Sequence, residues 1–361
     1  MDTHLTNTST FAELMGISSQ TLHHWYKEHL SGYEPIGRIE IHQNDITVKS
    51  GNKQEIIDIP ILLPENVGVA MAIDEKLIGE DFYTIFTNRE TGRIAFCGAT
   101  TNSKHLEQAM YPLTDSLTQV QTITRDMSPS YARLCNNIMP SAVQIADKFH
   151  VIKNLMDANN AVRVRYRQEI LETKRKALAR FKEEEGIRRK ECEKDGVKFK
   201  AQKFVHKEEK LANGETLSEI LSRSHLMLYK FSEQWNYKQQ FRAEILFDKF
   251  PDIAQAYKLS CIFRAWYSKS NVGLHNLQIE KGLHDWYDEV EMADIDEMLN
   301  FKAQVEANED IISAYFIRGN TNAIAENLNK RIKQYIASNN GVREVDFFFF
   351  RIKNFFASTS N

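Results

Sequence analysis

The chain has 361 residues, enough for two or three domains or for one large domain that carries an insertion. An apolar content of 42% and a charged content of 26% are ordinary for a soluble globular protein. No stretch approaches the roughly 18 continuous apolar residues that span a bilayer, and four scattered cysteines exclude a disulfide framework or a zinc ribbon. The sequence also begins without a signal-peptide pattern, so we expect a cytoplasmic protein with no membrane partner.

The net charge of −3 conceals an uneven distribution. Between Arg163 and Lys210 there are 17 basic and 10 acidic residues, a balance of +7, whereas the remaining residues include 29 basic and 39 acidic groups, a balance of −10. A protein that holds DNA while it gathers acids around metal ions has this asymmetry, and so has a solvated coiled-coil arm. Charge alone does not decide between the two.

Residues 1–35 contain a pattern typical of a helix-turn-helix, a candidate DNA-binding element. Thr10 and the glutamate three residues later form a capping-box pattern, Gly16 would supply the turn, and Ser18 would cap the next helix. We expect residues 19–29 to form the recognition helix. It would present four polar side chains to a DNA groove: Gln20, His23, His24 and Lys27. An ordinary helical hairpin, used for packing or dimer contacts, is the alternative.

Residues 36–65 are expected to form a β-rich linker that starts with a small hairpin. The main domain begins near Val67 with an apolar run that closes at Asp74, and two further segments with polar turns complete a three-stranded antiparallel meander. The next elements, in order, are a helix (103–117), a strand that ends at Asp126, a helix (130–137) and a strand (142–147). This order of elements predicts that residues 66–155 form the first part of a mixed α/β core.

The pattern of residues 156–314 is almost wholly helical and predicts an insertion domain. Residues 315–361 are expected to complete the core, with a helix that carries Glu326 and an aromatic C-terminal segment. That segment has six phenylalanines within residues 346–356. Stacking on single-stranded bases is one interpretation. We favour the other, burial against the core or a second subunit, because the run lacks surrounding polar spacing.

Three acidic residues form the candidate catalytic site: Asp74, Asp126 and Glu326. The first two follow strands, and active groups in such sheets usually lie at the carboxyl ends of strands. Phosphoryl transfer on DNA requires an activated attacking oxygen and a stabilised leaving oxygen, which two divalent ions can provide. Because Mg²⁺ prefers carboxylate oxygens, we predict a site for two Mg²⁺ or Mn²⁺ ions. A helix start is the ordinary alternative for Asp126, and Glu75, on the opposite strand face, ranks below Asp74.

Further polar residues accompany these acids. Asp147 and His150 lie three residues apart just past a strand, where a hydrogen-bonded pair or a phosphate-facing histidine is expected rather than a zinc pair. A helical wheel places three DNA-binding candidates on or near the face of Glu326: Asn329, Lys330 and Lys333. A surface ion pair between Glu326 and Lys330 is the alternative.

In these residues the chain resembles bacterial insertion-sequence transposases of the DDE class, in the ISL3 group, over about residues 66–356. The resemblance rests on Asp-Met-Ser from Asp126, Asp-x-Phe-His from Asp147 and Glu-x-x-Asn-x-x-Ile-Lys from Glu326, in this order. It implies a ribonuclease-H-like catalytic core. The expected fold class is thus α/β, a ribonuclease-H-like mixed sheet interrupted by a large all-helical insertion and preceded by a small helix-turn-helix.

The resemblance also implies residue roles and a reaction. Asp74, Asp126 and Glu326 would form the metal-binding catalytic triad, with Asp147 and His150 as supporting residues beside it. The implied chemistry is metal-dependent hydrolysis at transposon ends and strand transfer by the freed 3′-hydroxyl. The implied partners are double-stranded DNA of the transposon ends and the target, and further copies of the chain in a synaptic complex at the nucleoid.

Two departures from the family pattern leave alternatives open. Many relatives carry a cysteine-rich zinc-binding region before the core, which this sequence lacks, so end recognition would rest on a separate partner subunit or on residues 9–30 alone. Many relatives also have glycine after the catalytic glutamate, where this chain has Asn327. A domesticated or inactive DNA-binding protein and a metal-dependent nuclease without strand transfer are the alternative functions. The retained triad argues against the former.

Overall fold

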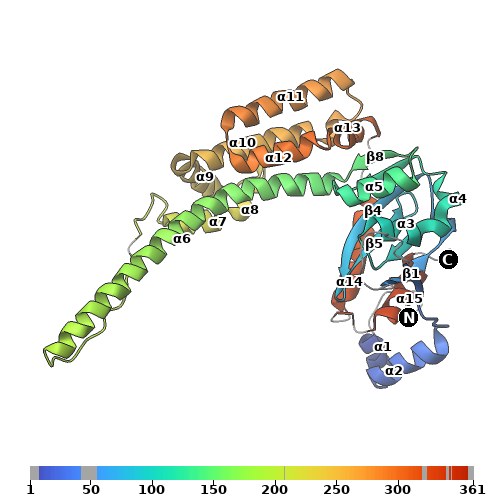
Figure 1. Ribbon diagram of the computed structural model, residues 1–361, viewed down its shortest axis with the longest axis horizontal. Coiled ribbons are helices and arrows are strands. Elements are labelled where there is room, and N and C mark those ends of the chain that lie inside the picture. Colours follow the sequence, from blue (N-terminus) through green and yellow to red (C-terminus); the bar gives the residue numbers. More distant parts are fainter. Residues whose placement is uncertain are drawn as a thin grey trace, which may run out of the picture. The chain divides into compact units, whose positions relative to one another are not determined.

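The computed structural model describes residues 8–41, 55–206, 208–318, 323–338, 341–342 and 344–356, and the protein is a mixed α/β chain (Figure 1). It divides into two compact units. The first unit comprises residues 1–151 and 310–361, and the second comprises residues 152–309. No helix in the described part of the chain combines the length and the apolar character needed to cross a membrane.

The first unit contains every described strand, with helices before, between and after the strands in the sequence. The strands are β1 (Gly37–Ile41), β2 (Glu55–Ile59), β3 (Ile61–Leu62), β4 (Ala70–Ile78), β5 (Asp81–Asn88), β6 (Ile94–Gly98), β7 (Thr122–Arg125) and β8 (Val143–Ala146). The helices are α1 (Thr8–Met15), α2 (Ser19–Trp25), η1 (Tyr26–Leu30), η2 (Pro64–Asn66), α3 (Ser103–Met110), η3 (Tyr111–Leu113), α4 (Thr114–Leu117), α5 (Pro129–Ile138), α13 (Glu309–Arg318), α14 (Ala323–Ser338) and α15 (Val345–Phe356).

A six-stranded sheet in the order β3-β6-β5-β4-β7-β8 organises the first unit. The β4–β5, β5–β6 and β3–β6 pairs are antiparallel, whereas β4–β7 and β7–β8 are parallel. Helices α3 to α5 connect the strands of the parallel part, since parallel neighbours need a crossover connection. The expected meander followed by strand–helix–strand units is thus confirmed.

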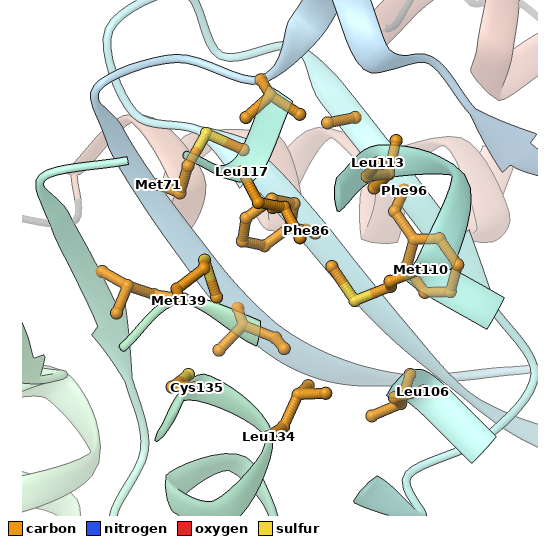
Figure 2. Close-up of a cluster of buried hydrophobic side chains, with 14 of the residues drawn as sticks. Met71, Phe86, Phe96, Leu106, Met110, Leu113, Leu117, Leu134, Cys135 and Met139 are labelled. Atoms are coloured by element: carbon orange, nitrogen blue, oxygen red, sulfur yellow. The ribbon is translucent and has the colours of Figure 1, made fainter. Parts of the chain in front are cut away.

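The sheet is buried on both faces because its strands carry apolar side chains on both sides. On one face, Met71 and Phe86 of the strands pack against Leu106 of α3 and Leu134 of α5, as Figure 2 shows. On the other face, Ile78 and Ile85 belong to a second cluster. That cluster also takes in α14 and α15 through Leu328, Ile332, Tyr335, Phe348, Phe349, Ile352 and Phe356. Both helices at the end of the chain are therefore part of the core that holds β4.

The phenylalanine-rich segment forms α15, and burial within the unit is the interpretation that the structure confirms. Phe348 and Phe349 face the sheet core, while the Phe347 ring makes edge contacts with Tyr26 and Tyr33, at centroid distances of 5.9 and 5.4 Å. Arg351 is 2% exposed, and its guanidinium lies near the rings of both Tyr26 and Tyr335. Helix α15 thereby connects the N-terminal helices to the sheet.

The second unit is helical apart from one isolated β-bridge between Lys210 and Thr216, in the part of the chain that the structure describes. Its helices are α6 (Lys148–Lys194, whose first residues belong to the first unit), α7 (Leu217–Arg223), α8 (His225–Leu228), η4 (Ser232–Gln234), α9 (Tyr237–Lys249), α10 (Pro251–Trp266), η5 (Lys269–Asn271), α11 (Asn276–Ala293) and α12 (Asp296–Glu306). The Phe263 ring anchors its core, 4.8 Å from the Trp286 ring and 5.4 Å from the Phe301 ring.

Two expectations about local structure need correction. The helix expected over 103–117 is interrupted at η3, because Pro112 removes a backbone N–H. Helix α1 begins at Thr8, so Thr10 lies inside it instead of capping it. Strand β1 pairs with β2 at residues 55–59. Residues 42–54, which include the second strand of the small hairpin expected in the linker, lie outside the described residues, so that hairpin stays a prediction. Ser18 does cap α2, because its hydroxyl accepts the Thr21 N–H at 3.0 Å.

Candidate active site

Three aspartates align across neighbouring parallel strands. The β4–β7 pairing ends with Ala72 opposite Thr124, and the β7–β8 pairing ends with Arg125 opposite Ala146. Carried onward, the same register places Asp74 level with Asp126, and Asp126 level with Asp147. Adjacent strands lie about 4.8 Å apart, so the backbones of these aspartates form a compact row at the carboxyl edge of the parallel strands.

Asp74 does not end its strand, contrary to the expectation. Strand β4 continues to Ile78 because its other edge stays paired with β5, where Asp74 lies opposite Ile85. What ends before Asp74 is the parallel pairing with β7. The aspartate is therefore held by a continuous strand on one side and faces an open strand edge on the other.

The carboxylate of Asp74 is largely buried and accepts two hydrogen bonds. The backbone N–H of Glu75 donates to Oδ1 at 2.8 Å, and Nδ2 of Asn329 on α14 donates to Oδ2 at 2.6 Å. Burial raises the pKa of Asp74 above its ordinary value, while the nearby His150 and the two hydrogen bonds oppose that rise. A buried acid with this environment is typical of functional sites.

Asp126 is fixed by the turn that starts α5. Its Oδ1 accepts the Ser128 N–H at 2.8 Å, and the Ser128 hydroxyl in turn caps α5. The buried guanidinium of Arg125 donates from Nη1 to the Asp126 carbonyl at 2.7 Å and from Nε to Gln144 at 2.6 Å. The cap of α5 is thus Ser128, and the second carboxylate oxygen of Asp126 has no hydrogen bond from the described residues.

Asp147 and His150 lie side by side, although Nδ1 of His150 makes no hydrogen bond within the described residues. Oδ1 of Asp147 accepts the Phe149 N–H at 2.9 Å, and its Oδ2 lies 3.3 Å from Nδ1 of His150. The interaction with Asp147 raises the pKa of His150, and Asp74 and Asp126 act in the same direction. All three aspartates therefore lie close enough to His150 to interact with it electrostatically.

Glu75 also belongs to this acidic environment, although the sequence ranked it below Asp74. Burial raises the pKa of Glu75, and the charges of Asp126 and Asp74 raise it further. Lys76 is the nearby cation that sequence reasoning missed: it is 8% exposed, and burial, followed by the charge of Lys333, lowers its pKa to about 8. The signal was available, because a residue two positions after Asp74 shares its strand face.

Helix α14 carries the third expected acid. Glu326 lies near the start of this helix, but its side chain is outside the part of the chain that the structure describes. Of the DNA-binding candidates one turn later, Asn329 is half-buried and bonded to Asp74, whereas Lys330 and Lys333 are exposed. The structure thus brings the helix of Glu326 to the strand of Asp74.

The candidates on α2 and η1 divide into two groups. Gln20 and His24 are exposed. His23 and Lys27 instead contact Glu344, just before α15, with Nε2–Oε1 and Nζ–Oε2 distances of 3.0 and 2.7 Å. Two of the four candidate groove-facing side chains are therefore engaged within the protein.

The donor set at the strand edge suits a hard divalent cation. Asp74 and Asp126 offer carboxylate oxygens, which Mg²⁺ and Mn²⁺ prefer, and the hydrogen bonds that these two carboxylates accept from the described residues come from backbone N–H groups and from the Asn329 amide. Within the described residues, no three His, Cys, Asp or Glu side chains are already gathered in metal-ligand geometry. The two described carboxylates fit such a cation, and the third expected ligand is the side chain of Glu326.

A family model described as a transposase, for the DDE class and the ISL3 group, matches residues 71–352. The matched span includes the row of aspartates, the whole second unit and α14. No curated protein matches the chain.

Proposed function

The chain belongs to the ISL3 group of DDE transposases, and on that premise we propose that it cleaves DNA at transposon ends and joins the freed 3′-hydroxyl to target DNA. Asp74, Asp126 and Glu326 are the catalytic triad in this proposal. A transposase acts on DNA, and the family generally uses divalent metals. The proposal adds to these family properties the identity of the catalytic residues, the number of ions and the reaction steps.

The observation that carries the proposal is the row of aspartates at the ends of the parallel pairings. Asp74 and Asp126 come from strands that are neighbours in space and lie 52 positions apart in sequence. Their carboxylates are held by backbone N–H donors of Glu75 and Ser128, which fixes their orientation without neutralising them. Carboxylate oxygens fixed at a sheet edge are what a cation-assisted phosphoryl transfer requires of the protein.

Each residue then has a defined task. Asp74, Asp126 and Glu326 would hold two Mg²⁺ or Mn²⁺ ions, which supply activation of the attacking oxygen and stabilisation of the leaving oxygen. Asp147 orients His150 beside them, and the raised pKa of His150 favours the protonated ring, which can donate to a DNA phosphate. Lys330 and Lys333, both exposed on α14, would contact the DNA backbone.

The arrangement of the first unit supports a ribonuclease-H-like catalytic core. Three antiparallel strands, β4 to β6, are followed by the parallel strands β7 and β8, with helices on both faces. We propose that residues 66–155 and 315–361 are this core and that residues 156–314 are its helical insertion. Residues 1–35 are the proposed helix-turn-helix, which acts alone or with a separate end-recognition subunit, and the active species is an oligomer.

Mutation of the second aspartate tests the triad. We expect Asp126→Asn to abolish Mg²⁺-dependent cleavage of a duplex that carries the element's own end, while binding of that duplex stays largely intact. The amide keeps the shape and the Ser128 hydrogen bond but removes the charge. Asp115→Asn, an exposed acid on α4, is the matched control and should cleave like the unmodified protein. Undiminished cleavage by Asp126→Asn would sink the triad.

The DNA-contact role of α2 has its own test. Deletion of residues 1–35 would also uncover Phe347 and Arg351, so point variants are sharper. Replacing Gln20 and His24 together by alanine should weaken end-specific binding in a gel-shift assay and leave the melting temperature unchanged, because both are exposed. Unaltered specificity would show that this helix only packs.

A further inference from the structure

Asn329 connects the strand of Asp74 to the helix of Glu326 through both its side chain and its backbone. Its Nδ2 donates to Oδ2 of Asp74 at 2.6 Å. Its carbonyl oxygen accepts from Nζ of Lys76 at 2.6 Å, and its Oδ1 lies 3.5 Å from the same ammonium. One residue of α14 is therefore bound by two positions of β4 that share a strand face.

These contacts use both the donor and the acceptor side of the amide. The NH₂ group faces an acceptor-only carboxylate, and the C=O side faces a donor-only ammonium. An aspartate here would place one carboxylate against another, and a lysine would place one ammonium against another. Asparagine is the side chain that satisfies both neighbours at this length.

Burial distinguishes this arrangement from a surface pair. Lys76 is 8% exposed, so its ammonium depends on protein acceptors in place of water. The helix beneath it is also fixed, because Leu328 and Ile332 on either side of Asn329 are buried in the core of the sheet. The apolar contacts set the distance between α14 and β4 but not the orientation of the polar side chains between them. The hydrogen bonds of Asn329 supply that orientation.

We propose that Asn329, supported by Lys76, is a positioning residue of the candidate active site, an inference that rests on the proposed function. It holds the Asp74 carboxylate in one orientation and fixes α14 against β4. Glu326 lies one helical turn before Asn329, so its backbone is placed by the same contact. The role differs from the DNA contact expected of Asn329 from the sequence, because its donor is directed to Asp74.

The consequence is a defined effect on cation binding. Residues that orient metal ligands without touching the ion typically change metal affinity or activity by about 10–100-fold when they are removed. Asn329→Leu keeps the approximate size of the side chain and removes its two side-chain polar contacts, while the backbone carbonyl still accepts from Lys76. We expect it to weaken Mn²⁺ binding by about 10–100-fold. Lys76→Met keeps the Asp74 bond and should weaken binding less, in the same direction.

The test is a Mn²⁺ titration followed by electron paramagnetic resonance, on the full chain bound to a duplex that carries the element's end. Thermal melting is measured on the same samples, so that a loss of fold is recognised. Asp74→Asn is the reference for loss of a ligand, and Gln334→Ala, an exposed amide on the same helix, is the matched control. The Mg²⁺ concentration for half-maximal cleavage is a second readout, which a purely structural role would not shift.

The outcomes distinguish a failure of the positioning role of Asn329 from a failure of the metal site itself. A weakened Mn²⁺ affinity in a folded Asn329→Leu protein, with Gln334→Ala unchanged, supports the positioning role. If Asp74→Asn abolishes Mn²⁺ binding while Asn329→Leu binds within about twofold of the unmodified chain, the positioning role is overturned and the proposed function stands. If the unmodified chain binds no Mn²⁺, the metal site fails and the inference fails with it. Should Asn329→Leu not fold, an unchanged affinity in Lys76→Met overturns the supporting role that the inference assigns to Lys76.

Discussion

Replacement of Arg351 by methionine should destabilise the first unit measurably, because this guanidinium is buried among aromatic rings. Its central carbon lies 5.3 Å from the Tyr26 ring, 5.5 Å from the Tyr335 ring and 5.6 Å from the Phe355 ring. These rings belong to η1, α14 and α15, so one side chain joins three helical elements. Methionine keeps most of the aliphatic stem and removes the charge.

The magnitude follows from burial. A desolvated cation–π contact contributes about 2 kcal/mol, whereas an exposed one contributes about 0.5–1 kcal/mol. The three rings share one guanidinium, and removing it also relieves the cost of burying a charge, so the contacts do not add. We expect Arg351→Met to lower the free energy of unfolding by about 2 kcal/mol. For a unit of this size that corresponds to a fall in melting temperature of about 4–8 °C.

Calorimetry on the full chain is the assay, and an exposed arginine supplies the control. Arg331 lies 4.7 Å from the Phe356 ring but is exposed on α14. Arg331→Met should therefore lose less than about 1 kcal/mol. Equal melting temperatures for Arg351→Met and Arg331→Met would refute the reasoning that burial makes the Arg351 contacts strong.

Three smaller predictions concern other parts of the structure. Glu344→Gln removes the contact with Lys27, but both side chains are partly exposed, so calorimetry should show a loss below about 1 kcal/mol. Leu134→Ala leaves a cavity in the fully buried core between α5 and the sheet and should cost about 2–5 kcal/mol in denaturant unfolding. The hydrogen bond from Arg242 lowers the pKa of Glu215 to about 2 from an ordinary 4.5, so its stabilisation is complete above pH 4.5 and is lost as the pH falls toward 2. Glu215→Gln should remove that acid-dependent change in the melting temperature of the second unit.

The sequence predicted the elements of the sheet well because each strand and turn has a local pattern. The strand that reaches Asp126, the helix that follows and the strand that reaches Asp147 all appear within one or two residues of their expected positions. The length of β4 beyond Asp74 was missed, since Glu75 and Lys76 look like the end of an apolar run. Pairing with β5 extends the strand through them, and pairing is not a local property.

The contacts that define the site could not be predicted, for the same reason. Asn329 and Asp74 are 255 positions apart, and their hydrogen bond depends on the docking of α14 against β4. A helical wheel places Asn329 near Lys330 on α14. It does not show that Asn329 is half-buried against β4 while Lys330 is exposed to solvent. Glu326 was a candidate as an acid on a distant helix, and the family resemblance then assigned it to the triad. His23 and Lys27 looked free to contact DNA because Glu344 lies more than 300 positions away.

The central claim is that Asp74, Asp126 and Glu326 bind the cations of a transposase active site. A crystal structure of the chain with Mn²⁺, in which anomalous scattering locates the ion, tests it most directly. The account predicts anomalous density at the carboxyl edge of β4 and β7, with carboxylate oxygens of Asp74 and Asp126 as ligands and Glu326 completing the set. Density that lies elsewhere, or an edge without density under conditions that support cleavage, would contradict it.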